Sequence, residues 1–179
     1  MSPALSTLTS APPPTDLAAL SALLRDAVES GASVGFLRPL TDAGLSAYWS
    51  GFVAPVAAGP RLLLVARDDT ARIVGSVQLE FAQKPNARHR CELQKLLVLR
   101  SHRGRRLGFT LVQSAEAAAL THGRTLIVLD TSATSHALNL YDFCGYTRAG
   151  VIPRYATDPD GTLIDTVVYY KELAVAPQP

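Results

Sequence analysis

One segment near the middle of the chain most constrains its fold and chemistry: Leu96–Phe109, which reads LLVLRSHRGRRLGF. An apolar stretch typical of a strand leads into a loop rich in glycine and arginine, and an amphipathic helix follows. The first N–H groups of a helix lack partners within it, and the helix dipole adds partial positive charge there. Gly104 and Gly108 let the backbone approach a ligand closely, and arginines add charge-assisted hydrogen bonds. The segment therefore predicts a binding site for an anionic group such as phosphate.

The charge of the whole chain favours a local anion site over a nucleic-acid surface. The 179 residues carry a formal net charge of only +2, whereas nucleic-acid-binding domains cluster positive charge over a whole face. Four arginines still fall within one short window: Arg100, Arg103, Arg105 and Arg106. Taken alone, the loop is equally compatible with a basic turn before a solvent-exposed helix, because short Gly/Arg loops are weak motifs.

Two cysteines and the absence of long apolar runs indicate where the protein works. Cys91 and Cys144 are too few for a disulfide scaffold, and neither has metal-ligand spacing. Cys144 precedes a glycine at an expected helix end, so we predict that it packs and is not a nucleophile. No apolar run approaches the roughly 20 residues that span a bilayer, and the N-terminus does not resemble a signal peptide. We therefore expect a cytoplasmic protein without membrane contact.

Hydrophobic periodicity and capping residues predict an α/β protein of one domain. The expected strands are Ala4–Thr9, Arg61–Arg67, Ile73–Gln83, Arg90–Leu99, Thr125–Thr131, Tyr146–Ile152 and Leu163–Leu173. Four helices are expected. The first is capped by Thr15 or Asp16 and ends at Gly31, and the second is Ala43–Ala58, capped by Thr41 or Asp42. The other two are Arg106–His122 and Thr134–Phe143. This order predicts a mixed sheet of six to seven strands with helices on both faces. Residues 1–14 are expected to be an N-terminal strand and linker, 15–175 the domain, and 176–179 a tail.

The glycine- and arginine-rich loop resembles the motif of the GNAT family of N-acetyltransferases. That motif is Arg/Gln-x-x-Gly-x-Gly/Ala between a strand and a helix, and Arg103–Gly108 overlies it in full register. One position departs from it, since Arg106 stands where the family has its first glycine. The order of strands and helices along the whole chain is also the family's order. Four segments further resemble the tabtoxin-resistance acetyltransferases of this family: Gly31–Phe36, Gln83–Asn86, Leu93–Leu99 and Tyr155–Leu163.

The resemblance implies acetyl-CoA as co-substrate, no metal, and a sheet that is splayed beside its fourth strand. The pantetheine arm would lie in that gap and the pyrophosphate on the loop. The implied cofactor-binding residues are Leu96, Leu97, Val98, Arg103, Gly104, Arg105, Arg106, Leu107, Gly108, Phe109, Thr134 and Tyr141. Thr134 replaces the asparagine of the family's second motif, and its hydroxyl has a shorter reach.

Acetyl transfer to an amine needs a base that removes a proton from the ammonium group and an acid that protonates the leaving thiolate. The resemblance places Tyr141 beside the thioester sulfur as the acid; the alternative is a core tyrosine. Glu92 begins the strand expected to contact the cofactor, and alternation would aim its side chain into the cleft. Asp130 ends the neighbouring strand, where such sheets place ligand groups. Acids at both positions act through water in the tabtoxin-resistance enzymes, although a solvent-facing Glu92 and a turn-stabilising Asp130 remain alternatives.

These observations favour an N-acetyltransferase that acetylates a small amine, such as a tabtoxin-like toxin or an antibiotic. One alternative is acetylation of a protein N-terminus or lysine, which would need an open groove. Another is a non-catalytic acyl-CoA-binding domain, because the side chain of Arg106 would crowd a pyrophosphate. Homodimers are common among enzymes of this kind, but no surface in the sequence indicates where two copies would meet.

Overall fold

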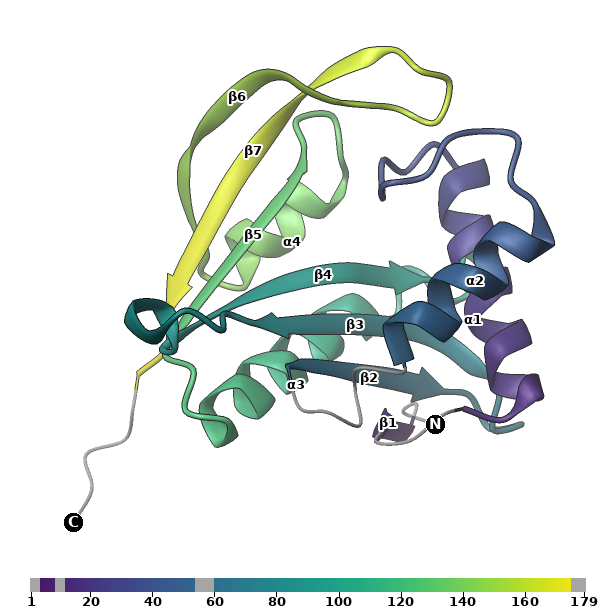
Figure 1. Cartoon of the computed structure of the whole chain (residues 1–179), viewed down its shortest axis with the longest axis horizontal. Coiled ribbons are helices and arrows are strands. Elements are labelled where there is room, and N and C mark those ends of the chain that lie inside the picture. Colours follow the sequence, from purple (N-terminus) through teal and green to yellow (C-terminus); the bar gives the residue numbers. More distant parts are fainter. Residues whose placement is uncertain (1–3, 9–11, 54–59, 175–179) are drawn as a thin grey trace.

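The computed structural model describes residues 4–8, 12–53 and 60–174, which form a seven-stranded mixed sheet with helices on both faces (Figure 1). The strand order is β1-β2-β3-β4-β5-β7-β6. The strands are β1 (Ala4–Leu8), β2 (Arg61–Arg67), β3 (Ile73–Phe81), β4 (Arg90–Val98), β5 (Leu126–Ser132), β6 (Thr147–Thr157) and β7 (Leu163–Glu172). The α-helices are α1 (Pro14–Glu29), α2 (Asp42–Val53), α3 (Leu107–Thr121) and α4 (Ala137–Phe143). The predicted α/β architecture and order of elements are confirmed.

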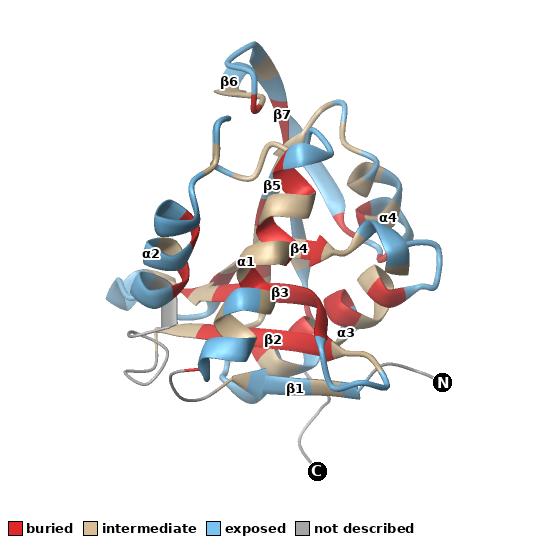
Figure 2. Ribbon diagram, turned by 90° about the vertical axis from the view of Figure 1, so that its right-hand side faces the viewer, coloured by how far each residue is buried: buried red, intermediate tan, exposed pale blue. Residues whose placement is uncertain are grey.

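Side chains of β2 point alternately to the two faces of the sheet and pack in a different core cluster on each face. Leu63 and Val65 pack in a cluster with α1 and α2, whereas Leu62 and Leu64 pack in a second cluster with α3. The strand is therefore buried on both sides, as its nearly continuous apolar sequence predicts. In Figure 2 the central strands are mostly buried, while β6 at the edge of the sheet is exposed along most of its length.

The sheet splays between β4 and β5. Within the described residues these parallel strands pair only where Arg90–Glu92 meets Leu126–Val128. Figure 1 shows β5 and β7 running steeply away from β4 beyond that point. The remainder of β4, residues 93–98, therefore has a backbone edge that β5 does not cover.

A bulge in β4 reverses which residues face α1 and α2. Lys95 has a φ of 48°, and the pairing of β3 with β4 shifts register between Ser76 and Gln78. Before the bulge, Leu93 packs on the α3 side, so its neighbour Glu92 lies on the α1/α2 face. After the bulge, Leu97 packs against α1 and α2. One extra residue in a strand produces this change of face.

Two expected helix starts are wrong. The first helix begins at Pro14, with Pro13 as N-cap and no side-chain cap, because proline is preorganised for the first turn. Asp16 does not cap the helix; it forms an ion pair with Arg67, with 2.6 Å between Asp16 Oδ2 and Arg67 Nη2. The α4 helix begins at Ala137, so Thr134 lies in the loop before it.

The other boundaries agree at one helix start and differ at one strand end. Thr41 caps α2, since its Oγ1 accepts a hydrogen bond from the N–H of Gly44 at 3.1 Å. The strand β6 extends to Thr157, five residues beyond the predicted end at Ile152, past a register irregularity. The predicted ends of the first strand and second helix, and the predicted tail 176–179, lie outside the described residues.

Candidate functional site

A cavity of about 1400 Å³ opens where β4 and β5 separate. It is lined by residues within segments 27–37, 92–98, 102–109, 130–143 and 155–157, and by Thr166. The cavity thus joins the loop after α1, the free part of β4, the start of α3, the end of β5 with α4, and β6.

The backbone of the loop before α3 is left-handed at Arg106, the position where the family motif has its first glycine. Arg106 is the N-cap residue of α3 and has a φ of 60°, in the left-handed region. Glycine reaches this region freely, whereas another residue there costs about 1–2 kcal/mol. Arg106 lines the cavity with an exposed side chain, and Leu107 and Gly108 in the first turn of α3 line it too.

The arginines of the loop differ in their contacts and in whether they line the cavity. Arg103 lines the cavity, and its guanidinium donates to the carbonyl of Val98 at 3.1 Å and to Ser30 Oγ at 3.3 Å. Arg100 forms an ion pair with Asp26, with 2.7 Å between Nε and Oδ1. Burial would raise the pKa of the Asp26 carboxyl, but hydrogen bonds from Arg100 lower it below its usual range. Arg105 is exposed and does not line the cavity, unlike the other predicted cofactor-binding residues.

Close packing at Gly108 joins the start of α3 to α4. A Cβ atom at this position would lie 3.1 Å from Cδ2 of Leu140. Glycine therefore lets the two helices approach each other beside the cavity. Thr134 also lines the cavity, but its hydroxyl lies 2.9 Å from that of Ser132 and the residue precedes α4.

Tyr141 lies in the wall of the cavity with only 5% of its surface exposed. Its ring packs against Tyr146 and Tyr169, at centroid distances of 5.8 and 5.7 Å. Burial, and then the nearby Cys144, Asp130 and Tyr169, raise the pKa of the Tyr141 hydroxyl. A phenol in this position stays protonated at neutral pH and can donate a proton.

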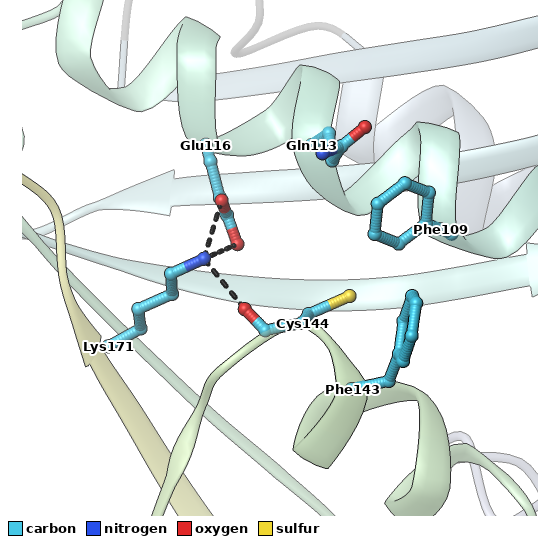
Figure 3. A pocket seen from close by; sticks show the side chains of 6 residues that line it. All are labelled: Phe109, Gln113, Glu116, Phe143, Cys144 and Lys171. Carbon is cyan, nitrogen blue, oxygen red and sulfur yellow. Dashed lines mark hydrogen bonds and ion pairs between the residues drawn. The ribbon is translucent and has the colours of Figure 1, made fainter.

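The end of α4 is fixed by contacts that the sequence did not indicate. Lys171 Nζ lies 2.8 Å from both carboxylate oxygens of Glu116 and 2.7 Å from the carbonyl oxygen of Cys144 (Figure 3). Tyr169 donates a hydrogen bond from its hydroxyl to Asp142 at 3.0 Å. These bonds tie α4 to α3 and β7, and so hold Tyr141 in place. A single lysine in a strand carries no motif, which explains why it was missed.

A second cavity, of about 260 Å³, is lined by Glu116, Cys144 and Lys171 together with Phe109, Gln113 and Phe143 (Figure 3). Phe109 and Phe143 line both cavities, and their rings meet edge to face at 5.4 Å. Cys144 is free and buried, and desolvation raises the pKa of its thiol to about 11. The thiol is therefore protonated at neutral pH, which supports the prediction of a packing role.

Both candidate bases lie in the large cavity. Glu92 is half-buried and accepts a hydrogen bond from Gln94 Nε2 at 2.8 Å. Asp130 is exposed to the cavity, and desolvation by the cavity walls raises the pKa of its carboxyl, although Lys95 opposes this. Lys95, which the sequence analysis did not single out, lines the same cavity. Its position depends on the bulge of β4, for which the strand sequence gives no signal.

Hydrogen bonds join the loop after α1 to the β6–β7 hairpin at one side of the cavity. Ser33 Oγ donates to the carbonyl of Thr157 at 2.8 Å. The N–H of Arg38 donates to the carbonyl of Pro159 at 2.9 Å, and Arg38 forms an ion pair with Asp160 at 2.9 Å. We call this connection, residues 33–38 with 157–160, the roof of the cavity.

Two features are absent from the part of the chain that the structure describes. No group of three or more His, Cys, Asp or Glu side chains in it could hold a metal ion. None of its helices combines the length and the hydropathy needed to cross a membrane.

Comparison with known proteins gives the cavity a family context. Solved structures with the same fold include a ribosomal-protein-alanine N-acetyltransferase from Brucella melitensis, with 23% identity, a TM-score of 0.79, and coverage of 95% of this chain and 99% of that one. An N-acetyltransferase from Staphylococcus aureus Mu50 has 19% identity and a TM-score of 0.77, with coverage of 96% and 99%. A phosphinothricin acetyltransferase from Sinorhizobium meliloti, solved in complex with acetyl-CoA, has 16% identity and a TM-score of 0.78, with coverage of 97% and 90%. The model of the acetyltransferase (GNAT) family matches residues 20–146, and the chain belongs to this family.

Proposed function

We propose that the protein transfers the acetyl group of acetyl-CoA directly to the amine of a small molecule. One observation carries this proposal: a single cavity contains the start of α3, the buried Tyr141 and the carboxylates of Glu92 and Asp130. These are an anion site, an acid and two candidate bases, which together are the groups that direct acetyl transfer requires. No covalent acyl-enzyme is needed, and Cys144 remains a protonated packing residue.

The binding of acetyl-CoA follows from the backbone around the cavity. The uncovered edge of β4 at Leu96–Val98 can pair with the amides of the pantetheine arm as an added strand would. The first N–H groups of α3, from Leu107 onward, can bind the pyrophosphate, and the cations Arg103 and Arg106 add charge-assisted hydrogen bonds. The left-handed backbone at Arg106 keeps these N–H groups available, so the missing glycine does not favour a non-catalytic domain.

The proton transfers are assigned as follows. Glu92 or Asp130, directly or through water, accepts a proton from the acceptor's ammonium group. The neutral nitrogen attacks the thioester carbonyl carbon, and the carbon–sulfur bond breaks as the tetrahedral intermediate collapses. Tyr141 gives its proton to the departing thiolate. The attacking nitrogen, positively charged after the attack, loses its second proton as the amide forms, and this proton returns to Tyr141 directly or through water. The base releases the first proton to solvent. The products are the N-acetylated amine and coenzyme A.

The roof favours a small acceptor over a protein. The bonds from Ser33 to Thr157 and from Arg38 to Pro159 and Asp160 connect two segments across one side of the cavity. An extended peptide would need an open groove at this place. The Brucella relative is named for acetylating a ribosomal protein, so a peptide acceptor is the second candidate to be tested.

The resemblance to tabtoxin-resistance enzymes selects the first acceptors for a test. The purified protein is incubated with acetyl-CoA and a panel of amines that includes tabtoxinine-β-lactam, aminoglycosides and an alanine-initiated peptide. We expect thiol release that depends on a small amine, together with a product heavier by one acetyl group. Coenzyme A binding without thiol release across the whole panel would support the non-catalytic alternative, and turnover of the peptide alone would support the protein acceptor.

We also propose that the protein acts in the cytoplasm as one domain comprising residues 15–175. The two cysteines are free and buried, which suits a reducing compartment. Fractionation of cells that produce the protein would test the compartment.

A further inference from the structure

Lys95 extends its side chain toward the roof of the cavity. The residue forms the bulge of β4, with a φ of 48° that residues other than glycine rarely adopt. Its Nζ lies 5.8 Å from the centroid of the Tyr48 ring on α2. A Cβ atom built on Gly35 would lie 3.8 Å from the same Nζ. The ammonium group therefore lies between α2 and the loop that follows α1, on the α1/α2 face of the sheet.

The charge of Lys95 has no carboxylate partner within ion-pair distance. Lys95 Nζ takes part in none of the ion pairs or hydrogen bonds found among residues 4–8, 12–53 and 60–174. Desolvation lowers the pKa of this ammonium group, while Asp130 and then Glu92 oppose the shift from a greater distance. A half-buried charge in such a position is stabilised by a bound counter-ion.

We infer that Lys95 binds an anionic group of the acceptor, so that the acceptor is an amine that also carries a carboxylate, as amino acids do. This inference rests on the proposed function, because it assigns the acceptor to the same cavity. The two charged groups of such a molecule are complementary to the charges that line the cavity: its ammonium group faces Glu92 and Asp130, and its carboxylate faces Lys95. The Tyr48 ring holds the ammonium group of Lys95 by a cation–π contact.

A purely internal role for Lys95 fits the geometry less well. If the lysine served only to neutralise Glu92 and Asp130, its long side chain would reach one of them within ion-pair distance. The Lys95 side chain instead places its Nζ near Tyr48 and Gly35 and forms no ion pair with Glu92 or Asp130. Glu92 already has a hydrogen-bond partner in Gln94.

Matched acceptors test the inference by kinetics. Each probe is an L-amino acid compared with its carboxamide, which keeps the amine and loses the negative charge. For the unmodified protein we expect kcat/KM to favour the amino acids by about 10-fold or more, since a desolvated charge pair contributes at least that much. Lys95→Met should raise KM for the amino acids about 10- to 100-fold and change the carboxamides by less than about 3-fold. Lys95→Arg should keep most of the preference. Unchanged coenzyme A affinity in both variants shows that they fold.

Three kinetic results would overturn the inference. The first is a preference of the unmodified protein for the carboxamides. The second is an equal loss for both kinds of probe in Lys95→Met, which would mean that Lys95 acts only through Glu92 and Asp130. The third is a carboxylate preference that survives in Lys95→Met.

A binding experiment separates this inference from the proposed function. N-acetyl-L-amino acids carry the carboxylate but no basic amine, so their binding to the coenzyme A complex does not require catalysis. By NMR titration we expect Lys95→Met to weaken their binding about 10-fold or more, and Glu92→Gln not to weaken it. If no probe is acetylated and this pattern appears, the proposed function fails for acceptors of this class and the anion site stands. If their binding is the same in Lys95→Met, the anion site is refuted.

Discussion

The two ends of the large cavity are built in different ways. The end proposed to bind the coenzyme comes mainly from one continuous segment, residues 96–109, and the groups proposed to bind the coenzyme there are largely backbone N–H and C=O groups. The proposed acceptor end is lined by side chains of β4 and β5, Glu92, Lys95 and Asp130, and the roof lies at one side of the cavity. A backbone site tolerates changes of side chain, as Arg106 shows, whereas a side-chain site changes its specificity with single substitutions.

Each end contains a residue other than glycine in the left-handed region, and the two have different consequences. At Arg106, with φ of 60°, the backbone turn presents the N–H groups of α3. At Lys95, with φ of 48°, the bulge redirects the side chain itself. Such conformations cost about 1–3 kcal/mol and persist where the surrounding structure supports them. The comparison therefore predicts that main-chain changes damage the coenzyme end most, and that charge changes damage the acceptor end most.

The largest effect is expected from Gly108→Glu. Its Cβ atom would lie 3.1 Å from Leu140, and its carboxylate would stand at the start of α3, where the pyrophosphate is proposed to bind. We expect coenzyme A affinity, measured by calorimetry, to fall about 100- to 1000-fold. The glutamate carboxylate would repel the phosphates and would occupy the N–H groups of α3 that are proposed to bind them. The control is Gly150→Glu, an exposed position where a Cβ atom meets nothing within 4 Å. Equal affinities in the two variants would refute a coenzyme site at α3.

The next effect is expected from Tyr141→Phe, which keeps the ring packing and removes the proposed acid. The value of kcat should fall about 100-fold, in the range typical of a lost general acid, with coenzyme A affinity unchanged. Tyr146→Phe is the matched control, since Tyr146 is equally buried and packs against Tyr141 but does not line the cavity. If Tyr141→Phe released thiol at the full rate in a discontinuous assay, Tyr141 would be a core residue and not the general acid.

The segment of the proposed coenzyme end could be recognised in the sequence because the features that single it out are local. An apolar strand, a Gly/Arg loop and an amphipathic helix occur in succession, and each has a physical signature in the order of residues. Even there, the side-chain partners were not predictable: Arg100 is paired with Asp26 from α1, and Arg105 does not line the cavity. Those outcomes depend on tertiary contacts that no short segment encodes.

The acceptor end could be predicted only in part. Alternation and strand ends correctly indicated that Glu92 and Asp130 would reach a common cavity. The bulge at Lys95 was not foreseen, because a bulge is a mismatch between two strands and leaves no mark in one of them. The roof was missed for a similar reason, since it joins residues more than 100 positions apart, such as Ser33 and Thr157.

Asp130→Asn should have opposite effects on activity and stability. If Asp130 shares the base role with Glu92, kcat/KM should fall by roughly 10-fold at neutral pH, less than for a sole general base. Burial raises the folded-state pKa of Asp130, so the folded protein loses stability as the pH rises above the usual carboxyl pKa of 3.8, and the full loss is present above the raised value. The variant should therefore show a higher Tm at pH 7, and the gain should vanish below the usual carboxyl pKa of 3.8. A lower Tm at pH 7 would contradict the desolvation of this side chain.

The smallest effect, and the sharpest test of the comparison, is expected from Arg106→Gly. Glycine relieves the left-handed strain but gains freedom in the unfolded chain, so stability should rise by only about 0.5–1 kcal/mol in urea titrations. Coenzyme A affinity should fall only about 3- to 10-fold, because an exposed cation contributes little beyond the backbone N–H groups. Arg106→Ala loses the same charge but keeps a Cβ atom at φ of 60°, so it should weaken binding equally without the gain in stability. A loss of affinity above about 100-fold in both variants would mean that the guanidinium, and not the main chain, is the principal phosphate ligand, and the coenzyme end would then be a side-chain site like the acceptor end.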